Sequence, residues 1–252
     1  MSHIFHPYTS FSTIQNDELP NITRGEGIYL YDDKGNRFVD VVSSWWACAL
    51  GHNHPVVVKA IKEQADILQH SITGGMTHPN VIKLAENLSL LMPSPDRHVV
   101  FASDGASSVE AALKIAVQYW HNIGRSEKKY LIGMDQGYHG DSLGALGVGF
   151  VDTFHEPYSE IITNTAKLPF PSPTDEDPHG FEPSRSIIIE RASELAAVIL
   201  EPLCLGSAGM KMYSPGYLQQ LAECCKEHDV LLIIDEIAMG FGRSVVFGVG
   251  LW

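Results

Sequence analysis

Alternating apolar and polar positions near the N-terminus predict a β-hairpin. In "GIYLYDDKGNRFVDVVSSWW", residues 27–46, two runs rich in apolar and aromatic side chains flank the turn-forming group "DDKGN". Successive side chains of a strand point to opposite faces, so each run has the pattern of a half-buried strand. Glycine and asparagine between the runs favour a tight turn. We therefore expect two antiparallel strands here.

The next two segments carry the apolar spacing of amphipathic helices. "HPVVVKAIKEQADILQH", residues 54–70, places apolar side chains three and four positions apart after Pro55. "HPNVIKLAENLSLLM", residues 78–92, repeats this pattern after Pro79. Proline is favoured in the first turn of a helix, where its missing N–H is not needed. We expect one helix to begin at each proline.

From residue 98 onward, short continuous apolar runs alternate with helical patterns. Such runs are typical of strands that are buried on both faces of a parallel sheet. The expected strands are "HVVFAS", "KYLIGMD", "LAAVILEP" and "VLLIIDE", and the expected helices are "SVEAALKIAVQYWHNIG" and "PGYLQQLAECCKEH". Residues 164–185 hold five prolines, which predicts a long surface loop. The expected fold class is α/β, a mostly parallel sheet with helices on both faces.

Composition and charge narrow the class of protein. The chain has 252 residues, 44% hydrophobic and 19% charged, and a formal net charge of −13. This charge argues against a nucleic-acid partner, because binding phosphates requires a basic face. No run of apolar residues is long enough for a membrane span, and the N-terminus lacks the layout of a secretory signal. The four cysteines have no metal-binding spacing, and we expect them to be reduced in a cytoplasmic protein.

The stretch "VLLIIDEIAMGFGR" places Asp235 directly after an apolar run. A nucleotide hydrolase would use such an acid to hold magnesium, but it would also need a G-x-x-x-x-G-K-[ST] loop. The sequence contains no Gly-Lys dipeptide, which argues strongly against that interpretation. Two alternatives remain for Asp235: it caps the following turn, or it lies beneath a heterocyclic cofactor.

Two glycine-containing turns could contribute to the same site. In "ASDGASSVEAALK", the N–H groups of Gly105 and Ala106 at a helix start would attract a phosphate. The structural alternative is a capping box between Ser107 and Glu110, and both interpretations can hold together. In "GYHGDSLGAL", Tyr138 and His139 follow a strand, where ligands of α/β sheets bind and a flat side chain can stack. The alternative there is a surface turn with incidental aromatic residues.

The adjacent tryptophans Trp45 and Trp46 form a fourth feature, in "SSWWACALGHNHP". On a strand their side chains would point to opposite faces, so both cannot belong to a simple core. One of them is expected to face a pocket or a partner. The alternative is one core tryptophan and one interface tryptophan.

Together these stretches resemble the class III aminotransferases, which are fold-type I enzymes dependent on pyridoxal phosphate. The resemblance covers nearly the whole chain, from "HPYTSF" through "GFGR". The motifs that carry it are "HPYTS", "SSWWACALGHNHP", "GGMTHP", "FASDGASSVEAALKIAVQYW", "GYHGDSLGAL", "LEPLCLGSAGMKMYSPGYL" and "IIDEIAMGFGR". The first two favour the biotin-pathway branch over branches that act on diamines or ω-amino acids.

The resemblance implies a role for each matching residue. Gly105 and Ala106 would bind the cofactor phosphate, although the family usually has serine in place of Ala106. Tyr138 would stack on the pyridine ring beside His139. The remaining roles are Asp235 paired with the pyridinium nitrogen, Glu201 supporting Asp235 near the ring, and Tyr8, Trp45 and Trp46 walling the substrate pocket. An ionised carboxylate at the ring nitrogen favours its protonated form, in which the ring best accepts electrons.

One part of the family's pattern is missing from this sequence. The family's Schiff-base lysine follows the aspartate strand by about one further strand and loop. All ten lysines precede Asp235, and none matches the family's motif, so no catalytic lysine is assigned. The resemblance thus implies a C-terminally truncated enzyme, and an inactive fragment that binds cofactor weakly or pairs with full-length subunits is the alternative.

The expected organisation has three parts. Residues 1–70 form an N-terminal segment of the small domain, residues 71–243 the first part of the large cofactor-binding domain, and residues 244–252 a divergent apolar tail. The resemblance implies small-molecule substrates and a homodimer in full-length members. We expect no metal, and composition and charge argue against a membrane span and a nucleic-acid partner.

Overall fold

The computed structural model describes residues 3–7, 9–10, 19–92, 97–163 and 165–243. Contacts along the chain divide it into two units, Met1–His78 and Pro79–Trp252. The tail at residues 244–252 lies outside the described residues. The domain boundaries expected near residues 70 and 243 therefore stay predictions.

In the part of the first unit that the structure describes, a three-stranded antiparallel sheet is followed by one helix. Its strands are β1 (Ile22–Glu26), β2 (Tyr29–Asp32) and β3 (Arg37–Val39), in the order β1-β2-β3. The hairpin between β2 and β3 confirms the prediction from alternation. The carboxylate of Asp32 closes its turn by accepting hydrogen bonds from the backbone N–H groups of Lys34 and Asn36. Helix α1 (Pro55–Ala65) begins at its proline, as predicted.

The second strand of the hairpin is shorter than expected. It ends at Val39, and the residues Ser43–Trp46 have left-handed φ values between 49° and 67°. Non-glycine residues rarely adopt this conformation, so side-chain bonds must support it. The carboxylate of Asp40 accepts a 2.7 Å bond from the Ser44 hydroxyl and lies 2.8 Å from Nε2 of His52. The tryptophan pair therefore lies in a turn and not on a strand.

The second unit is built on a four-stranded parallel sheet with the order β5-β4-β6-β9. Its strands are β4 (Tyr130–Met134), β5 (Lys167–Leu168), β6 (Leu195–Leu200) and β9 (Leu231–Ile234). Its helices are α2 (Pro79–Leu91), α3 (Gly105–Asn122), α4 (Leu143–Val148), α5 (Asp152–His155), the 3-10 helix η2 (Glu156–Tyr158), α6 (Glu182–Arg191) and α7 (Pro215–Glu227). A two-stranded antiparallel ribbon joins β7 (Cys204–Leu205) and β8 (Lys211–Met212).

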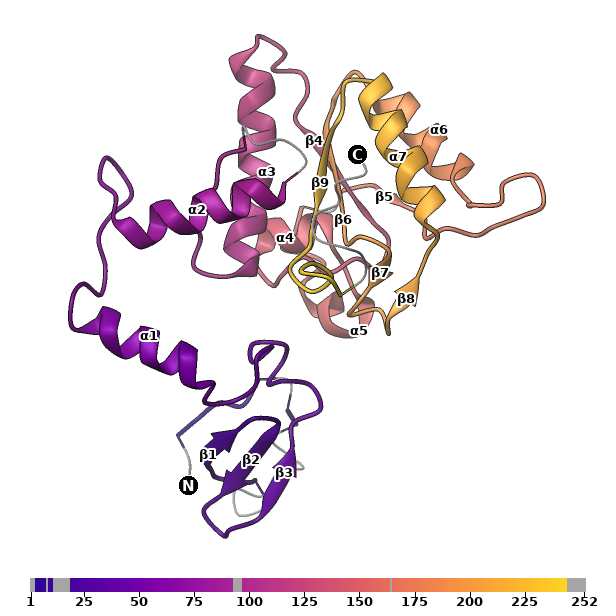
Figure 1. Cartoon of the computed structure of the whole chain (residues 1–252). Helices are drawn as coiled ribbons and strands as arrows, with labels where there is room; N and C mark the ends of the chain where they lie inside the picture. Colours follow the sequence, from indigo (N-terminus) through magenta and orange to yellow (C-terminus); the bar gives the residue numbers. More distant parts are fainter. Residues whose placement is uncertain (1–2, 8, 11–18, 93–96, 164, 244–252) are drawn as a thin grey trace. The chain divides into compact units, whose positions relative to one another are not determined.

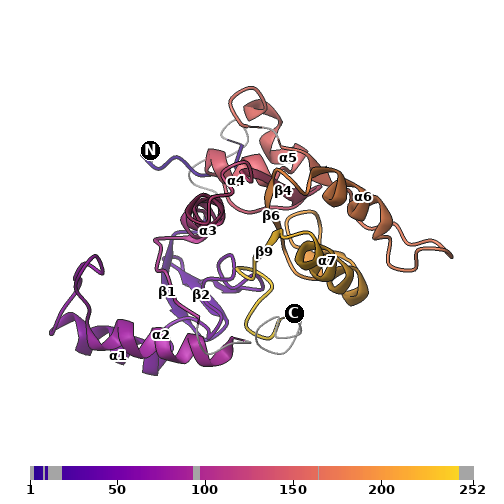
Figure 2. The same cartoon turned by 90° about the horizontal axis from the view of Figure 1, so that it is seen from above.

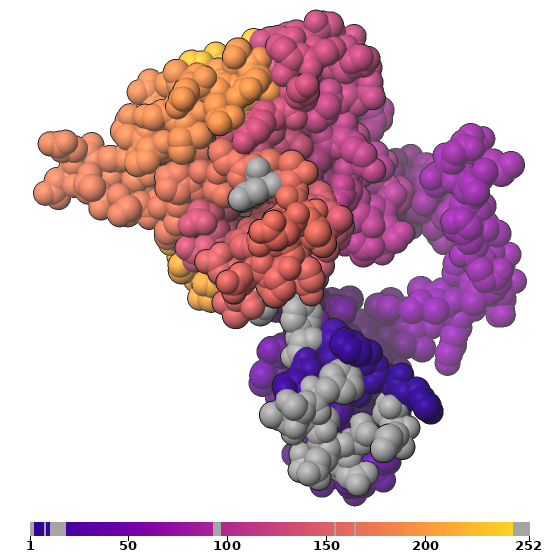
Figure 3. All heavy atoms as spheres, turned by 180° about the vertical axis from the view of Figure 1, so that it is seen from behind, coloured from indigo at the N-terminus to yellow at the C-terminus, as the bar shows by residue number. Residues whose placement is uncertain are grey.

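Helices cover both faces of this sheet, as predicted for an α/β fold. Helices α3 and α4 lie on one face, and α6 and α7 lie on the other (Figure 1 and Figure 2). The larger apolar core lies on the α6 and α7 side, and a smaller core joins α3 and α4 to the sheet. All six residues of β6 are buried, which is why the apolar run has no alternation. In the second unit, Figure 3 shows the magenta region of the chain packed beside the orange region that follows it.

Two elements differ from the sequence prediction. Residues 98–102 do not form a strand, and Val100 and Phe101 are exposed. A strand needs a hydrogen-bonded neighbour, and none lies beside this segment in the described part of the chain. The segment 164–185 is not wholly a surface loop, because β5 pairs with β4 and buries Leu168 completely. Its proline-rich middle does remain without regular structure before α6 begins at Glu182.

The described residues contain no group of three or more His, Cys, Asp or Glu side chains placed to hold a metal ion. No described helix is long and apolar enough to span a membrane. The four cysteines are free thiols. Burial raises the pKa of the Cys225 thiol to about 12, so this side chain stays protonated at neutral pH.

Candidate functional site

Six of the predicted site residues gather at the carboxyl ends of the parallel strands. They lie after β4, β6 and β9 and at the start of α3, and they are Gly105, Ala106, Tyr138, His139, Glu201 and Asp235. In an open α/β sheet this edge is where ligands bind, because the strands all end there and loops diverge. The parallel topology therefore brings together residues that the sequence separates by more than a hundred positions.

Asp235 and His139 form a buried pair at the end of β9. Nδ1 of His139 lies 2.7 Å from Oδ2 of Asp235, and both side chains are almost completely buried. The other carboxylate oxygen, Oδ1, accepts a 3.0 Å bond from the N–H of Ile237. A buried carboxylate requires such partners, because the loss of its hydration is costly in free energy unless other hydrogen bonds replace it. Both oxygens of Asp235 are thus held in place, and each retains capacity for a further donor.

The second ring nitrogen of His139 has no hydrogen-bond partner among the described residues and is buried. The pairing of His139 with Asp235 was not predicted from the sequence, which placed His139 only beside Tyr138. The two residues stand 96 positions apart, and no local pattern signals their contact. The pair fixes the ring orientation of His139 and the carboxylate plane of Asp235.

Glu201 follows β6 and connects that strand to the loop after β4. Its carboxylate accepts a 3.1 Å bond from the N–H of Tyr138 and a 2.9 Å bond from the N–H of Gly206. Burial raises the pKa of Glu201, the two backbone N–H groups oppose this, and the nearby charge of Asp235 adds to the rise. Glu201 thereby positions the backbone of the residue that was predicted to stack on the cofactor.

Tyr138 is half-buried and held at two points. Its hydroxyl donates a 3.0 Å bond to Oδ2 of Asp141. Its ring stacks on that of His155, with centroids 6.0 Å apart and an angle of 15° between the planes. Offset stacking at this separation is a favourable arrangement for flat rings. Neither Asp141 nor His155 was singled out in the sequence, although Asp141 follows the "GYHG" stretch directly.

The start of α3 combines a capping side chain with two small residues. Asp104 is the N-cap, and its carboxylate accepts bonds from the N–H of Ser107 at 2.8 Å and from the Ser107 hydroxyl at 2.9 Å. These bonds hold the pKa of Asp104 below its usual value. Gly105 and Ala106 form the first turn, so their N–H groups point out of the helix end, where anions bind.

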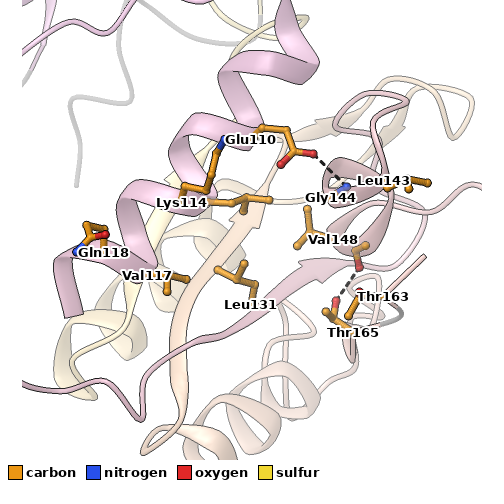
Figure 4. A pocket seen from close by; sticks show the side chains of 12 residues that line it. Glu110, Lys114, Val117, Gln118, Leu131, Leu143, Gly144, Val148, Thr163 and Thr165 are labelled. Carbon is orange, nitrogen blue, oxygen red and sulfur yellow. Dashed lines mark hydrogen bonds between the residues drawn. The ribbon is translucent and has the colours of Figure 1, made fainter. Parts of the chain in front are cut away.

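The predicted capping box between Ser107 and Glu110 is wrong. With Asp104 as the N-cap, Glu110 lies too far along α3 to reach back to the helix start. Its carboxylate instead accepts a 2.7 Å bond from the Ser142 hydroxyl and a 3.0 Å bond from the N–H of Gly144, at the start of α4 (Figure 4). Glu110 therefore joins α3 to α4.

Close packing connects the start of α3 with the loops after β4 and β9. Gly140 has a φ of +116°, and a Cβ atom on it would lie 2.5 Å from Cβ of Ala106. A Cβ atom on Gly105 would lie 3.0 Å from Cδ1 of Ile237. A side chain at Gly140 would push the loops apart, whereas a side chain at Gly105 would require the end of the Ile237 side chain to shift. Gly140 was missed as a site residue, although the glycines flanking Tyr138 and His139 were a usable signal.

The predicted substrate-wall residues belong to the first unit. Trp45 is 67% exposed and Trp46 is 41% exposed. Tyr8 lies outside the described residues. Their role in a substrate pocket stays a prediction.

A pocket of about 490 Å³ lies between α3, α4 and β4 (Figure 4). Leu113, Val117 and Val148 contribute to its lining. Residue 164 belongs to the same stretch as the lining residues Thr163 and Thr165 but is outside the described part of the chain. We assign no ligand to this pocket.

The residues at the strand ends fit pyridoxal phosphate. The paired carboxylate of Asp235 suits a protonated ring nitrogen, and the half-buried Tyr138 offers a flat surface. The start of α3 offers N–H groups beside two residues without long side chains, so a phosphate can approach the backbone. The geometry is thus consistent with the roles implied by the resemblance.

Comparison with known proteins points to one family. The family model described as "Aminotransferase class-III" matches residues 12–250. Adenosylmethionine-8-amino-7-oxononanoate aminotransferase from Staphylococcus aureus (strain NCTC 8325 / PS 47) is 38% identical, over 96% of this chain and 56% of that protein. The chain therefore spans little more than half the length of the curated relatives it matches.

Solved structures agree with this result. The crystal structure of the enzyme of the same name from Methanocaldococcus jannaschii DSM 2661 superposes with a TM-score of 0.90 at 38% identity, covering 96% of this chain and 54% of that one. An amine transaminase from an uncultivated Pseudomonas species, in its PLP-bound form, gives a TM-score of 0.86 at 31% identity, covering 97% of this chain and 58% of that one. The chain belongs to the class-III aminotransferases, fold-type I enzymes whose cofactor is pyridoxal phosphate.

Proposed function

We propose that this chain carries cofactor-binding residues of an enzyme that transfers an amino group to 8-amino-7-oxononanoate and forms 7,8-diaminononanoate in biotin synthesis. S-adenosylmethionine is the proposed donor. The observation that carries the proposal is the buried Asp235–His139 pair at the end of β9, in a chain whose relatives have this activity in their names.

Pyridoxal phosphate, when bound, withdraws electrons from the carbon that carries the transferred amino group. In the proposed site, Asp235 accepts a hydrogen bond from the protonated ring nitrogen and stabilises its positive charge. His139 orients the carboxylate by its 2.7 Å contact. Gly105 and Ala106 donate backbone hydrogen bonds to the phosphate.

Two further groups complete the proposed cofactor contacts. Tyr138 covers one face of the pyridine ring and excludes water from it. Glu201 holds the Tyr138 backbone through the N–H bond at 3.1 Å. Tyr8, Trp45 and Trp46 are proposed to line the substrate pocket. All of these residues bind and orient, and none of them is assigned as the group that moves the proton.

The proton transfer and the covalent attachment need an amine that these 252 residues do not supply at the family's position. Each of the ten lysines precedes Asp235 in the sequence. Catalytic groups must lie within a fraction of an ångström of the productive geometry, so a lysine elsewhere is a poor substitute. We therefore expect the 252-residue chain to bind the cofactor and to show no turnover by itself.

A chimera tests the proposed reaction. Residues 1–243 would be joined to the C-terminal part of the Staphylococcus aureus relative, beginning at the position aligned with residue 244. We expect this protein to form 7,8-diaminononanoate from S-adenosylmethionine and 8-amino-7-oxononanoate, as measured by mass spectrometry. The same chimera carrying Asp235→Ala is the inactive control. An active cofactor-loaded chimera that makes no such product would rule out the proposed substrates.

Another ω-aminotransferase activity, on a diamine or an ω-amino acid, is the second candidate. The observation that favours it is the structural similarity to an amine transaminase at a TM-score of 0.86. The amino donor that the chimera accepts distinguishes the two candidate activities. Turnover with a diamine or an ω-amino acid but not with S-adenosylmethionine would favour the second candidate. A lysine donor belongs in the same assay.

We also propose a homodimer and a cytoplasmic location for the complete protein. The reduced cysteines and the acidic charge support the cytoplasmic location. Sedimentation of the chimera tests the homodimer. A monomer that remains fully active would contradict the proposed dimer.

A further inference from the structure

His155 lies against the ring of Tyr138, outside the group of residues that the sequence singled out. It is the last residue of α5, and its side chain is 3% exposed. Its ring is nearly parallel to that of Tyr138, and the ring of Phe150 packs against it at 63° with centroids 5.7 Å apart. The protein thus places a buried, flat side chain nearly parallel to the Tyr138 ring.

Hydrogen bonds define the orientation of the His155 ring. The N–H of Val151 donates a 3.0 Å bond to Nδ1, so Nδ1 is an acceptor and the proton of the neutral ring is on Nε2. Nε2 faces Oδ1 of Asp141 at 3.4 Å. The other oxygen of Asp141 accepts the bond from the Tyr138 hydroxyl. One carboxylate therefore connects the two stacked rings at their edges.

These contacts restrict the Tyr138 ring in two ways. The hydroxyl bond fixes the tip of the ring but permits rotation about the axis through that tip. Stacking on a nearly parallel buried ring opposes this rotation, because turning the Tyr138 plane would lose the stacked arrangement. If the Tyr138 ring is to stack on a flat ligand, both the tip of the ring and its plane must be held in place.

We propose that His155 is a positioning residue that fixes the plane of the Tyr138 ring, so that the opposite face is ready to stack on the cofactor pyridine. The identity of the stacked ligand rests on the proposed function. The effect of His155 on the Tyr138 ring does not rest on the proposed function, because it can be observed in the cofactor-free chain.

Nuclear magnetic resonance of the cofactor-free chain tests the positioning role directly. Tyrosine rings would be isotope-labelled, and Tyr138→Phe would identify the Tyr138 signals. We expect His155→Ala to shift and average these signals, and His155→Gln, which keeps a donor near Asp141 but lacks a flat ring, to do the same. Unchanged Tyr138 signals in both folded variants would overturn the proposal.

His179→Ala is the matched control. His179 is half-buried in the same unit and contacts the Ser214 hydroxyl at 3.0 Å, at the start of α7. This variant should change stability but leave the Tyr138 signals as in the wild type. Tyr138 signals that respond equally to His179→Ala would show a general loosening of the fold and would also overturn the proposal.

Cofactor binding supplies the second readout, through a double-mutant cycle. His155→Ala should raise the dissociation constant of pyridoxal phosphate about tenfold, the scale expected for a misplaced stacking platform. In a Tyr138→Ala background the same substitution should change the constant less than about twofold, because residues that act through one another are not additive. Equal losses in the two backgrounds would contradict a role through Tyr138.

The two proposals fail in different ways. Wild-type chain that does not bind pyridoxal phosphate, with Tyr138 signals that respond to His155→Ala, would refute the proposed function and support the positioning role. Cofactor binding with Tyr138 signals that do not respond to His155→Ala would support the proposed function and refute the positioning role.

Discussion

Asp235 is the residue whose substitution separates a cofactor site from a structural turn. Asp235→Asn retains the size of the side chain but removes the negative charge beside the ring nitrogen. We expect the dissociation constant of pyridoxal phosphate to rise about tenfold or more, because hydrogen bonds to charged groups contribute about 1.5–3 kcal/mol. Equilibrium dialysis with the purified chain measures this change.

Asp229→Asn is the control for Asp235→Asn. Asp229 lies at the opposite end of β9, is largely exposed and pairs with Arg125 at 3.0 Å. Its replacement should leave the cofactor affinity within about twofold of the wild type. Exposed ion pairs contribute little, and this pair lies at the amino end of β9, away from the carboxyl ends of the strands. Equal losses for the two variants would show that Asp235 has no special contact with the cofactor.

The buried carboxylate of Glu201 predicts a pH-dependent stability difference. Its pKa is raised in the folded protein, so the folded state favours the protonated form more than the unfolded state does. The stability from this group is present below its unfolded pKa and is lost as pH rises through its folded pKa. Glu201→Gln cannot titrate, so any stability deficit of this variant should shrink as pH rises from 4 to 7.

Urea unfolding at several pH values measures the Glu201 effect, with Glu223→Gln as the control. Glu223 is exposed on α7, and its carboxylate accepts a 3.1 Å bond from the side-chain amide of Gln219. Its substitution should give a difference from the wild type that does not change with pH. A Glu201→Gln deficit that grows toward pH 7 would contradict the raised pKa.

At the residue scale, the motifs predicted the chemistry but not the contacts. Asp235, Glu201 and Tyr138 were identifiable because each follows an apolar strand in a recognisable stretch. The His139–Asp235 pair and the His155–Tyr138 stack depend on how distant loops meet, and residue spacing contains no information about that. A capping box with Glu110 was one of two interpretations of this stretch, because its spacing from Ser107 fits, but Asp104 is the N-cap.

At the scale of elements, Lys128 joins three segments of the second unit. Its side chain is completely buried, and Nζ donates to the carbonyls of Ala192 at 2.6 Å and Asp229 at 2.7 Å, with a longer bond to Leu195. The ammonium also lies 4.7 Å from the ring centroid of Trp120. Burial lowers the pKa of Lys128, and the charge of Arg125 adds to this effect. The end of α6, the start of β6 and the turn before β9 thus share one donor.

Lys128→Met is expected to destabilise the protein by about 3 kcal/mol or more. The methionine fills similar space, but the carbonyls would remain buried without a donor, and each such group costs about 1–3 kcal/mol. Lys129→Met changes the exposed neighbouring residue and should stay within about 0.5 kcal/mol of the wild type. Chemical denaturation compares the two, and similar values would show that the Lys128 bonds contribute nothing net.

The elements themselves were largely predictable. Strands β4, β6 and β9 are continuous apolar runs, and α3 and α7 show clear helical spacing, so length and pattern together decided their type. Strand β5 has two residues, too few for any periodicity. The opposite error at residues 98–102 arose because an apolar run forms a strand only beside a strand that pairs with it; without one among the described residues, Val100 and Phe101 stay exposed.

At the scale of the whole molecule, the class was predictable because several levels agree. Buried strands, helices on both faces and the motifs at the strand ends all indicate one α/β family, and the match over residues 12–250 confirms it. The chain divides into two units after His78, and the domain boundary expected after residue 70 stays a prediction. The left-handed turn that carries Trp45 and Trp46 was missed, because four such residues in a row have no sequence signature.

Pyridoxal phosphate binding to the wild-type chain, with and without borohydride, tests the central claim most directly. We predict saturable binding at one site per chain that Asp235→Asn weakens, and no cofactor fixed to a lysine after reduction. Peptide mass spectrometry would locate any adduct among the ten lysines. Absence of saturable binding would contradict the proposed cofactor site. Stoichiometric fixation of the cofactor on one lysine would contradict the expectation that none of these ten lysines holds it.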